Sequence, residues 1–155
     1  MKNREISSQH QKLKSLIAKT SAACSNDIEL QSYWAKYLCI VTAGLIENAL
    51  KEIYSEYVTR VASPTVANYA VTHLSRIQNP KTSAFLQLAK SFKTDWQVDL
   101  QTFVDDDGRR EAIDSIMTNR HLIAHGKDSN ITVAQLKGWL EKAVEIFEFM
   151  ETQCA

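Results

Sequence analysis

The sequence predicts an all-α fold, a bundle of five to seven helices around one long apolar helix. Apolar residues recur with the 3.6-residue period of a helix in several segments of the chain. The 155 residues include only four Gly and two Pro, too few for the many tight turns of a sandwich or barrel. Hydrophobic residues make up 45% of the chain, which suits one ordinary core. We therefore expect a single domain over residues 1–155.

The first two predicted helices form the long half of the bundle. The first covers about residues 5–20, where charged residues alternate with apolar ones. The second begins after Asn26, which together with Glu29 suits a capping arrangement, and continues to about Val61. Its middle, residues 37–46, is apolar on all sides, which is typical of a helix at the centre of a bundle. This run is shorter than the roughly 20 residues that span a bilayer, so no membrane association is expected.

Five shorter helices are predicted from capping residues. Ser63-Pro64 and Asn79-Pro80 each place a capping residue before a Pro at the first helical position, which predicts helices at about 64–77 and 80–92. Caps at Thr94, Asp107 and Thr132 predict the last three helices, at about 94–104, 109–126 and 132–150.

Charge and cysteine content restrict the functional classes. Lys+Arg and Asp+Glu balance at 18 each, so a broad basic surface for nucleic acid is not indicated, and a polyanion would need a local cationic cluster. Cys24, Cys39 and Cys154 form no CxxC pair and no even disulfide set. With no apolar secretion signal at the N-terminus, these features favour a cytoplasmic protein.

Candidate chemistry is concentrated in residues 119–126, which hold two of the four histidines, an arginine, an asparagine and a glycine. Gly just after a periodic segment is typical of a helix end. His121 and His125 share one helix face, whereas Arg120 and His125 lie about 7.5 Å apart along the axis and about 140° apart around it. Arg120 and His125 can therefore act together only through an irregular last turn, a second chain, or both.

Two interpretations of this segment remain open. In the structural one, His125 and Lys127 interact with the negative end of the helix dipole and Arg120 is solvated. In the functional one, an imidazole exchanges protons near pH 7 beside a fixed cation that binds an oxyanion or phosphate. Asn119 and His121 would then orient the ligand. RNA cleavage needs little more, because the 2′-hydroxyl serves as nucleophile, a His deprotonates it and an Arg stabilises the phosphate charge.

The segment from Arg120 to His125, followed by Gly126, resembles the Arg-x4-His signature of the HEPN superfamily of small all-α proteins. Within that superfamily it is most similar to the RiboL-PSP and related stand-alone branches. The likeness covers about residues 27–150, and includes a long apolar second helix with an acidic residue, Glu47, and a final amphipathic helix.

The resemblance implies a metal-independent endoribonuclease without a cofactor, of the kind found in toxin–antitoxin or antiviral defence systems. It also implies a homodimer in which two motifs face one cleft that binds RNA. His125 would be the general acid or base and Arg120 the phosphate anchor. His121, in the polar position after the Arg, would orient substrate or act with His125, and Asn119 would be a hydrogen-bonding neighbour.

The chain departs from the HEPN pattern at Lys127. HEPN toxins paired with a nucleotidyltransferase antitoxin commonly carry a Tyr two residues after the His, which the antitoxin modifies. Lys127 occupies that position, so silencing by adenylylation is put in doubt, although another antitoxin or defence-system partner remains possible. Lys127 is either solvated or adds positive charge to a phosphate-binding cleft.

Two other features have open interpretations. Glu47 either pairs with Lys51 one turn later or forms a salt bridge that holds Arg120. The acidic run 105–107 is better explained as a solvated turn than as a cation site, because adjacent carboxylates seldom converge on one ion. The alternative to an enzyme is a HEPN-fold module for protein interaction or nucleotide binding that has lost cleavage.

Overall fold

The computed structural model describes all 155 residues and confirms the all-α prediction, with seven helices and no strand. In chain order the helices are α1 (Arg4–Ala23), α2 (Ile28–Val61), α3 (Pro64–Leu74), α4 (Thr82–Phe92), α5 (Thr94–Val104), α6 (Arg109–Ala124) and α7 (Val133–Gln153). None of them combines the length and the continuous apolarity that crossing a bilayer requires.

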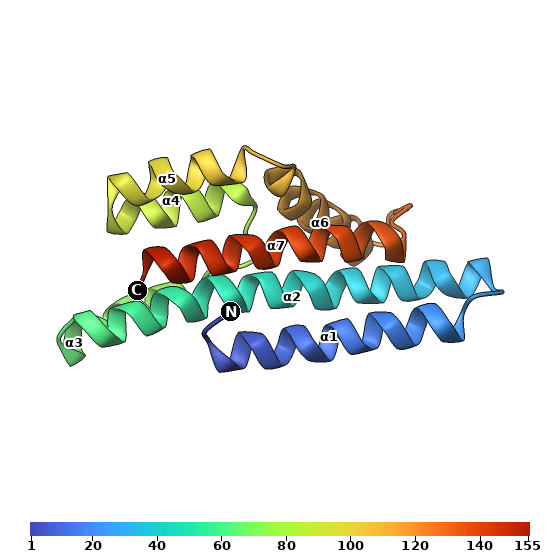
Figure 1. Cartoon of the computed structure of the whole chain (residues 1–155), viewed down its shortest axis with the longest axis horizontal. Coiled ribbons are helices and arrows are strands. Elements are labelled where there is room, and N and C mark those ends of the chain that lie inside the picture. The colour runs from blue at the N-terminus through green and yellow to red at the C-terminus, as the bar shows by residue number, and fades with distance from the viewer.

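The long helix α2 organises the bundle. Its 34 residues extend about 50 Å at 1.5 Å per residue. In Figure 1, α1 and α7 run beside it, the α4–α5 hairpin lies along one side of α7, and α6 crosses near the other end of the molecule. The short helix α3 projects at the far end of α2 and packs chiefly against α2.

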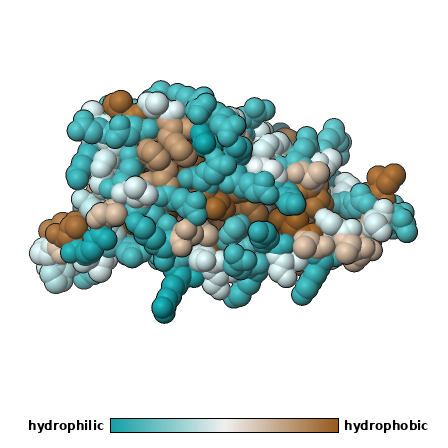
Figure 2. Space-filling view, in the orientation of Figure 1, coloured by the Kyte–Doolittle hydropathy of each residue, from teal (hydrophilic) through white to brown (hydrophobic).

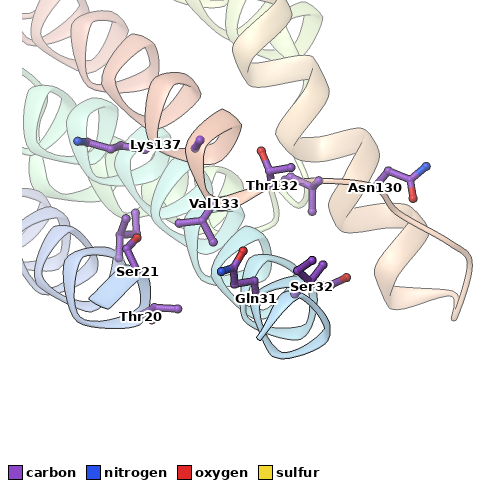
Figure 3. Close-up of a pocket in the computed structure, with 12 residues that line it drawn as sticks. Thr20, Ser21, Gln31, Ser32, Asn130, Thr132, Val133 and Lys137 are labelled. Atoms are coloured by element: carbon purple, nitrogen blue, oxygen red, sulfur yellow. The ribbon is translucent and has the colours of Figure 1, made fainter. Parts of the chain in front are cut away.

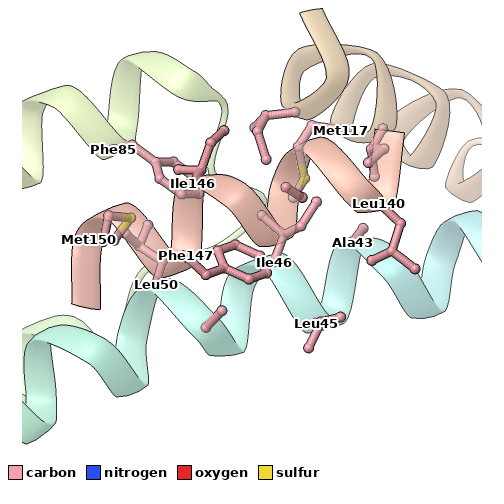
Figure 4. Close-up of a cluster of buried hydrophobic side chains, with 14 of the residues drawn as sticks. Ala43, Leu45, Ile46, Leu50, Phe85, Met117, Leu140, Ile146, Phe147 and Met150 are labelled. Carbon is pink, nitrogen blue, oxygen red and sulfur yellow. The ribbon is translucent and has the colours of Figure 1, made fainter. Parts of the chain in front are cut away.

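A single cluster of 31 buried hydrophobic residues, with members from all seven helices, forms the core. Figure 4 shows Ile46 and Leu50 of α2 facing Phe147 and Met150 of α7, with Phe85 of α4 covering the same cluster. Phe147 is fully buried, and burying such a side chain stabilises a fold by about 1.5–3 kcal/mol. The surface in Figure 2 is mostly hydrophilic, with its main apolar area where α1, α2 and α7 adjoin.

The predicted capping residues of α3 and α7 occupy the N-cap positions, whereas that of α2 is shifted by one residue. Ser63 precedes Pro64 at the first position of α3, although its side chain makes no capping bond and α3 ends at Leu74 rather than near residue 77. Thr132 and Gln135 form a complete capping box at the start of α7. The cap of α2 is shifted by one residue, because Asp27 rather than Asn26 accepts the Leu30 amide, at 2.9 Å.

The predicted start of α4 at Pro80 is wrong, and the reason is tertiary. Asn79 has a left-handed φ of +48° and donates its amide to Glu47, at 2.8 Å. The helix begins two residues later at Thr82, whose amide donates to Asp114 of α6, at 2.8 Å. A carboxylate from another helix therefore satisfies the first free N–H of α4, so no local capping residue is needed.

The predicted caps of α5 and α6 are also shifted by one residue. Lys93 occupies the N-cap position of α5 without a side-chain capping bond, and Thr94 is the first helical residue. Gly108, with φ +70°, caps α6 in place of Asp107. The Asp107 carboxylate instead pairs with Lys142 of α7.

The acidic run before α6 is an ion-pair cluster. Asp105 accepts a hydrogen bond from Arg110 at 2.5 Å, while the Arg109 guanidinium lies near the carboxylates of both Asp106 and Asp107. Each of the three carboxylates therefore has a basic partner, and the Asp107–Lys142 pair connects the α5–α6 turn to α7.

Candidate functional site

Helix α6 carries the motif at its C-terminal end. Ala112, Ile113, Ile116 and Met117 are buried against the core and fix one face of the helix. The Cys39 thiol of α2 contacts the Ile116 carbonyl oxygen at 3.6 Å, so α6 lies directly against α2 at this level. The next turn of α6 leaves the core and presents its polar side chains at the surface.

The chain reverses direction immediately after the motif. His125 is the C-cap of α6 and Gly126 follows in the left-handed region, with φ +65°. The Gly126 amide donates to the Ile123 carbonyl at 3.1 Å, and the Lys127 amide to the Leu122 carbonyl at 2.9 Å. These two bonds define a Schellman motif, in which a glycine after the cap is favoured. The predicted helix end at Gly126 is thus confirmed, with the last helical residue at Ala124.

The two motif imidazoles lie side by side at this helix end. The ring centroids of His121 and His125 are 4.4 Å apart, with ring planes at 58°. Both side chains are exposed, and neither makes a hydrogen bond within the chain. Two adjacent imidazoles with free nitrogens can serve as a base and an acid in one reaction.

Arg120 is half-buried beside the histidines along α6, and its guanidinium forms no ion pair or hydrogen bond with another side chain. Its charge is therefore available for an anion. The structure brings His121 and His125 into contact but joins Arg120 to neither ring. This matches the helical geometry, in which Arg120 and His125 project in different directions.

Asn119 has a structural role that its place in the motif does not reveal. Its side-chain amide donates to the Ser115 carbonyl at 2.9 Å, and its carbonyl accepts from the Ser129 hydroxyl at 2.7 Å. Ser129 is buried although it lies in the loop between α6 and α7. Asn119 therefore fastens this loop to α6. No sequence pattern pointed to Ser129, because only the folded loop brings it back onto the helix.

Of the two interpretations of Glu47, the structure agrees with the pairing to Lys51. Its carboxylate pairs with Lys51 at 2.8 Å and accepts the Asn79 amide at 2.8 Å. It does not contact Arg120. From the Cys39–Ile116 contact, Glu47 lies about 12 Å farther along α2, whereas Arg120 lies about 6 Å farther along α6, which crosses α2 obliquely (Figure 1). The predicted salt bridge between Glu47 and Arg120 is therefore wrong within one chain.

Lys127 is exposed just after the turn, with no acidic partner. The loop that it begins continues to a pocket of about 590 Å³ between the end of α1, the start of α2 and the start of α7. Figure 3 shows Thr20, Gln31 and Asn130 among the polar side chains around it. Arg120, His121 and His125 do not line this pocket. His121 and His125 are exposed at the surface, and Arg120 is half-buried.

A scan against family models matches residues 2–155 to the family described as RiboL-PSP-HEPN. The match covers nearly the whole chain. The protein belongs to the RiboL-PSP-HEPN family. The HEPN assignment includes α1, and so extends beyond the residues 27–150 that carried the resemblance in the sequence. Searches of curated proteins and of solved structures give no match to this HEPN chain.

Proposed function

We propose that this HEPN protein is a metal-independent endoribonuclease. The observation that carries the proposal is the pair of exposed imidazoles, His121 and His125, 4.4 Å apart and next in sequence to an arginine without an acidic partner. The family assignment supports it, because HEPN domains are commonly ribonucleases. The site provides groups that move protons and a group that binds phosphate, which is the chemistry that RNA cleavage requires.

In the proposed reaction the ribose 2′-hydroxyl attacks the adjacent phosphorus. One imidazole, assigned to His125, accepts the 2′-hydroxyl proton as the new P–O bond forms. The bond from phosphorus to the 5′-oxygen breaks, and a protonated imidazole, assigned to His121, donates the proton that the leaving oxygen needs. Arg120 stabilises the charge on the non-bridging oxygens. The products are a 2′,3′-cyclic phosphate and a free 5′-hydroxyl, with no net change in protons.

The proposed active form is a homodimer with a composite cleft. Two features support it: His121 and His125 are exposed at the surface, and no hydrogen bond joins Arg120 to His125 within one chain. A second chain facing the first would supply the missing wall and place Arg120 of one copy beside His125 of the other. Lys127, exposed at the same end, would add positive charge to this cleft, and Asn119 would support it by holding the loop.

We further propose a role as a toxin or antiviral-defence effector in the cytoplasm, on the basis of the family resemblance. The formal net charge of zero favours a short or structured target over broad affinity for RNA, because phosphate contacts dominate non-specific binding. Control by an antitoxin that modifies a tyrosine is not proposed, because Lys127 occupies the position that the tyrosine would need.

The test is cleavage of total or transfer RNA in excess EDTA. Wild type is expected to cleave and to leave 2′,3′-cyclic phosphate ends, while His125→Ala and Arg120→Ala each lose about 10²–10⁴-fold in rate. His73→Ala and Arg76→Ala are matched controls, since both residues are exposed on the opposite end of the molecule. Activity that EDTA abolishes, or that the motif variants retain, would exclude this mechanism.

A second candidate function is nucleotide or partner binding without cleavage. The pocket of about 590 Å³ favours it, because its volume lies in the range of small-molecule sites and its lining mixes apolar side chains with amides and hydroxyls. A wild type that is inert on every RNA, but whose melting temperature rises with an added nucleotide, would favour this function over the ribonuclease.

A further inference from the structure

The pocket between the end of α1 and the starts of α2 and α7 contains a buried hydroxyl that the chain leaves without a partner. Thr20 lines this space of about 590 Å³ and is only 5% exposed (Figure 3). Its hydroxyl makes no bond to a preceding carbonyl, unlike those of Thr42 and Thr72 in α2 and α3. The fully enclosed side-chain atoms without a partner belong to Tyr54 and Gln153, so the Thr20 hydroxyl still opens into the pocket. An unpaired polar group in a nearly closed position indicates a place for a ligand atom.

The first turn of α7 adds free backbone donors to the same pocket. The capping box satisfies the amides of Thr132 and Gln135. The amides of Val133 and Ala134 have no acceptor, and both residues line the pocket. The N-terminal end of a helix also carries a partial positive charge of about half an elementary charge. This end of α7 therefore favours an anion in the pocket.

Lys137 gives the pocket a full positive charge. It lies one turn after the first residue of α7 and lines the same space. The lysine ion pairs of the chain involve Lys51 and Lys142, so the Lys137 ammonium has no carboxylate partner. No Asp or Glu lines the pocket. The pocket therefore offers one ammonium, two amides and a hydroxyl, which suits a ligand group with a single negative charge.

An apolar groove continues from this pocket between α1 and α7. A second hollow of about 370 Å³ shares Ile17 and Lys137 with the pocket and is also lined by Leu140 and Val144. Figure 2 shows the main apolar area of this face where α1, α2 and α7 adjoin. His10, which lines the far end of the hollow, lies seven residues before Ile17, or about 10 Å along α1. The groove therefore extends the pocket by roughly this length.

The ionisable groups at the far end of the groove balance one another. Lys14 of α1 and Glu141 of α7 carry opposite charges there. Burial, together with the positive charge of Lys14, lowers the pKa of His10, so its imidazole is neutral near pH 7. The unbalanced positive charge thus lies at the pocket end, on Lys137 and the start of α7. An elongated anion is then oriented with its charge in the pocket and its apolar body in the groove.

We propose that the pocket and the groove together bind an unbranched aliphatic monocarboxylate. Its carboxylate accepts hydrogen bonds from Lys137, from the first amides of α7 and from the Thr20 hydroxyl. Its hydrocarbon chain lies along Leu140 and Val144, where it is removed from water. A phosphate monoester, with about 1.5–2 negative charges, would keep uncompensated charge beside a single ammonium.

A ligand in the pocket also reaches the loop that follows the motif. Asn130 and Ile131 line the pocket, and their neighbour Ser129 donates to Asn119 of α6, at 2.7 Å. Asn119 directly precedes Arg120 in the sequence. A carboxylate that packs against the loop therefore restrains the last turn of α6 without contacting the motif side chains.

The test is calorimetric titration of the full chain with decanoate, without RNA and below the concentration at which decanoate forms micelles. Decanoate should bind about tenfold more tightly than octanoate, because two more CH₂ groups are buried. Decanol should bind at least about tenfold more weakly than decanoate, because it lacks the charge. Adenosine monophosphate that binds as tightly as decanoate would overturn the proposal in favour of nucleotide binding.

Two variants test the position of the carboxylate. Lys137→Gln should weaken decanoate binding by about tenfold or more. Ala134→Glu adds a carboxylate to the first turn of α7, where it favours the helix, so the variant should fold and yet not bind decanoate. Lys19→Gln, at an exposed position of α1 that lines neither hollow, is the matched control and should bind as wild type does. Decanoate binding that is absent in wild type, equalled by decanol or retained by either variant would overturn the proposal.

Hydrogen–deuterium exchange tests the link to the motif. Decanoate should slow exchange of the amides of residues 127–131 and of the last turn of α6, and in Asn119→Ala the slowing should be confined to the loop. Unchanged exchange in the loop would overturn the link. The site and the ribonuclease can fail separately: a chain that binds decanoate and cleaves no RNA overturns the ribonuclease alone, whereas a chain that cleaves RNA and binds no decanoate overturns the carboxylate site alone.

Discussion

Gly126 is the residue on which the shape of the motif turn depends. Its φ of +65° is left-handed, and open space surrounds the position of a Cβ atom, so only backbone strain opposes a side chain there. Gly126→Ala should lower the free energy of unfolding by about 1 kcal/mol. Gly138 is also uncrowded, but lies inside α7, so Gly138→Ala should raise it by about 0.5–1 kcal/mol. Urea unfolding of both variants checks the difference in sign.

Substitutions at the Asn119–Ser129 hydrogen bond show whether Asn119 supports the loop or contacts the substrate. Asn119→Ala removes the acceptor of a buried hydroxyl and should destabilise the fold by about 1–3 kcal/mol. Ser129→Ala removes the other partner, so the double variant should lose less than the sum of the two single losses. Asn130→Ala, at an exposed neighbour, is the control. If Asn119→Ala lowers cleavage while leaving the urea midpoint unchanged, Asn119 acts on the substrate instead.

At the scale of single elements, the ion pair between Asp107 in the α5–α6 turn and Lys142 should contribute less stability in acid. The hydrogen bond from Lys142 lowers the pKa of Asp107 below its usual 3.8. A carboxyl whose pKa falls on folding stabilises the native state above its unfolded pKa, and that contribution is lost as pH falls through the folded value. The stability advantage of wild type over Asp107→Asn should therefore be constant near neutrality and shrink below about pH 4. Urea midpoints of both proteins across this range test it.

The helices show which structural signals are local. Apolar periodicity and capping residues together predicted all seven elements, and the capping box at Thr132 formed as expected because both of its partners lie within one turn. The start of α4 could not be predicted in this way. Asp114 lies 32 residues from the Thr82 amide, and Glu47 lies 32 residues from the Asn79 amide, so the boundary depends on helices that meet only in the folded chain.

Part of the candidate site could likewise be predicted from the sequence, and part could not. The neighbouring imidazoles follow from the four-residue spacing of His121 and His125, which places both on one helix face. The interpretation of Glu47 depended on the packing angle and direction of α2 and α6, which the sequence does not contain. The exposure of Tyr37 and Ile40 was missed because a helix apolar on all sides suggests complete burial within one chain.

At the scale of the whole molecule, a composite cleft predicts complementation between inactive chains. Arg120→Ala and His125→Ala are each expected to be inactive. After mixing and subunit exchange, half of the dimers combine both variants, and each of these contains one intact pair of Arg120 and His125. Activity should therefore recover to roughly a quarter of wild type. Measuring cleavage before and after exchange checks this, and no recovery would mean that each chain uses its own pair.

The position of α3 has a dynamic consequence. Only Ala67 and Leu74 of this helix are buried, and α2 is its main support. Segments with few buried apolar contacts open locally at a lower free energy than the global transition. In hydrogen–deuterium exchange, the amides of α3 should therefore exchange well before those of the central part of α2, which is covered on several sides. The end of the molecule opposite the motif can then open and close many times while the residues proposed for catalysis stay in place.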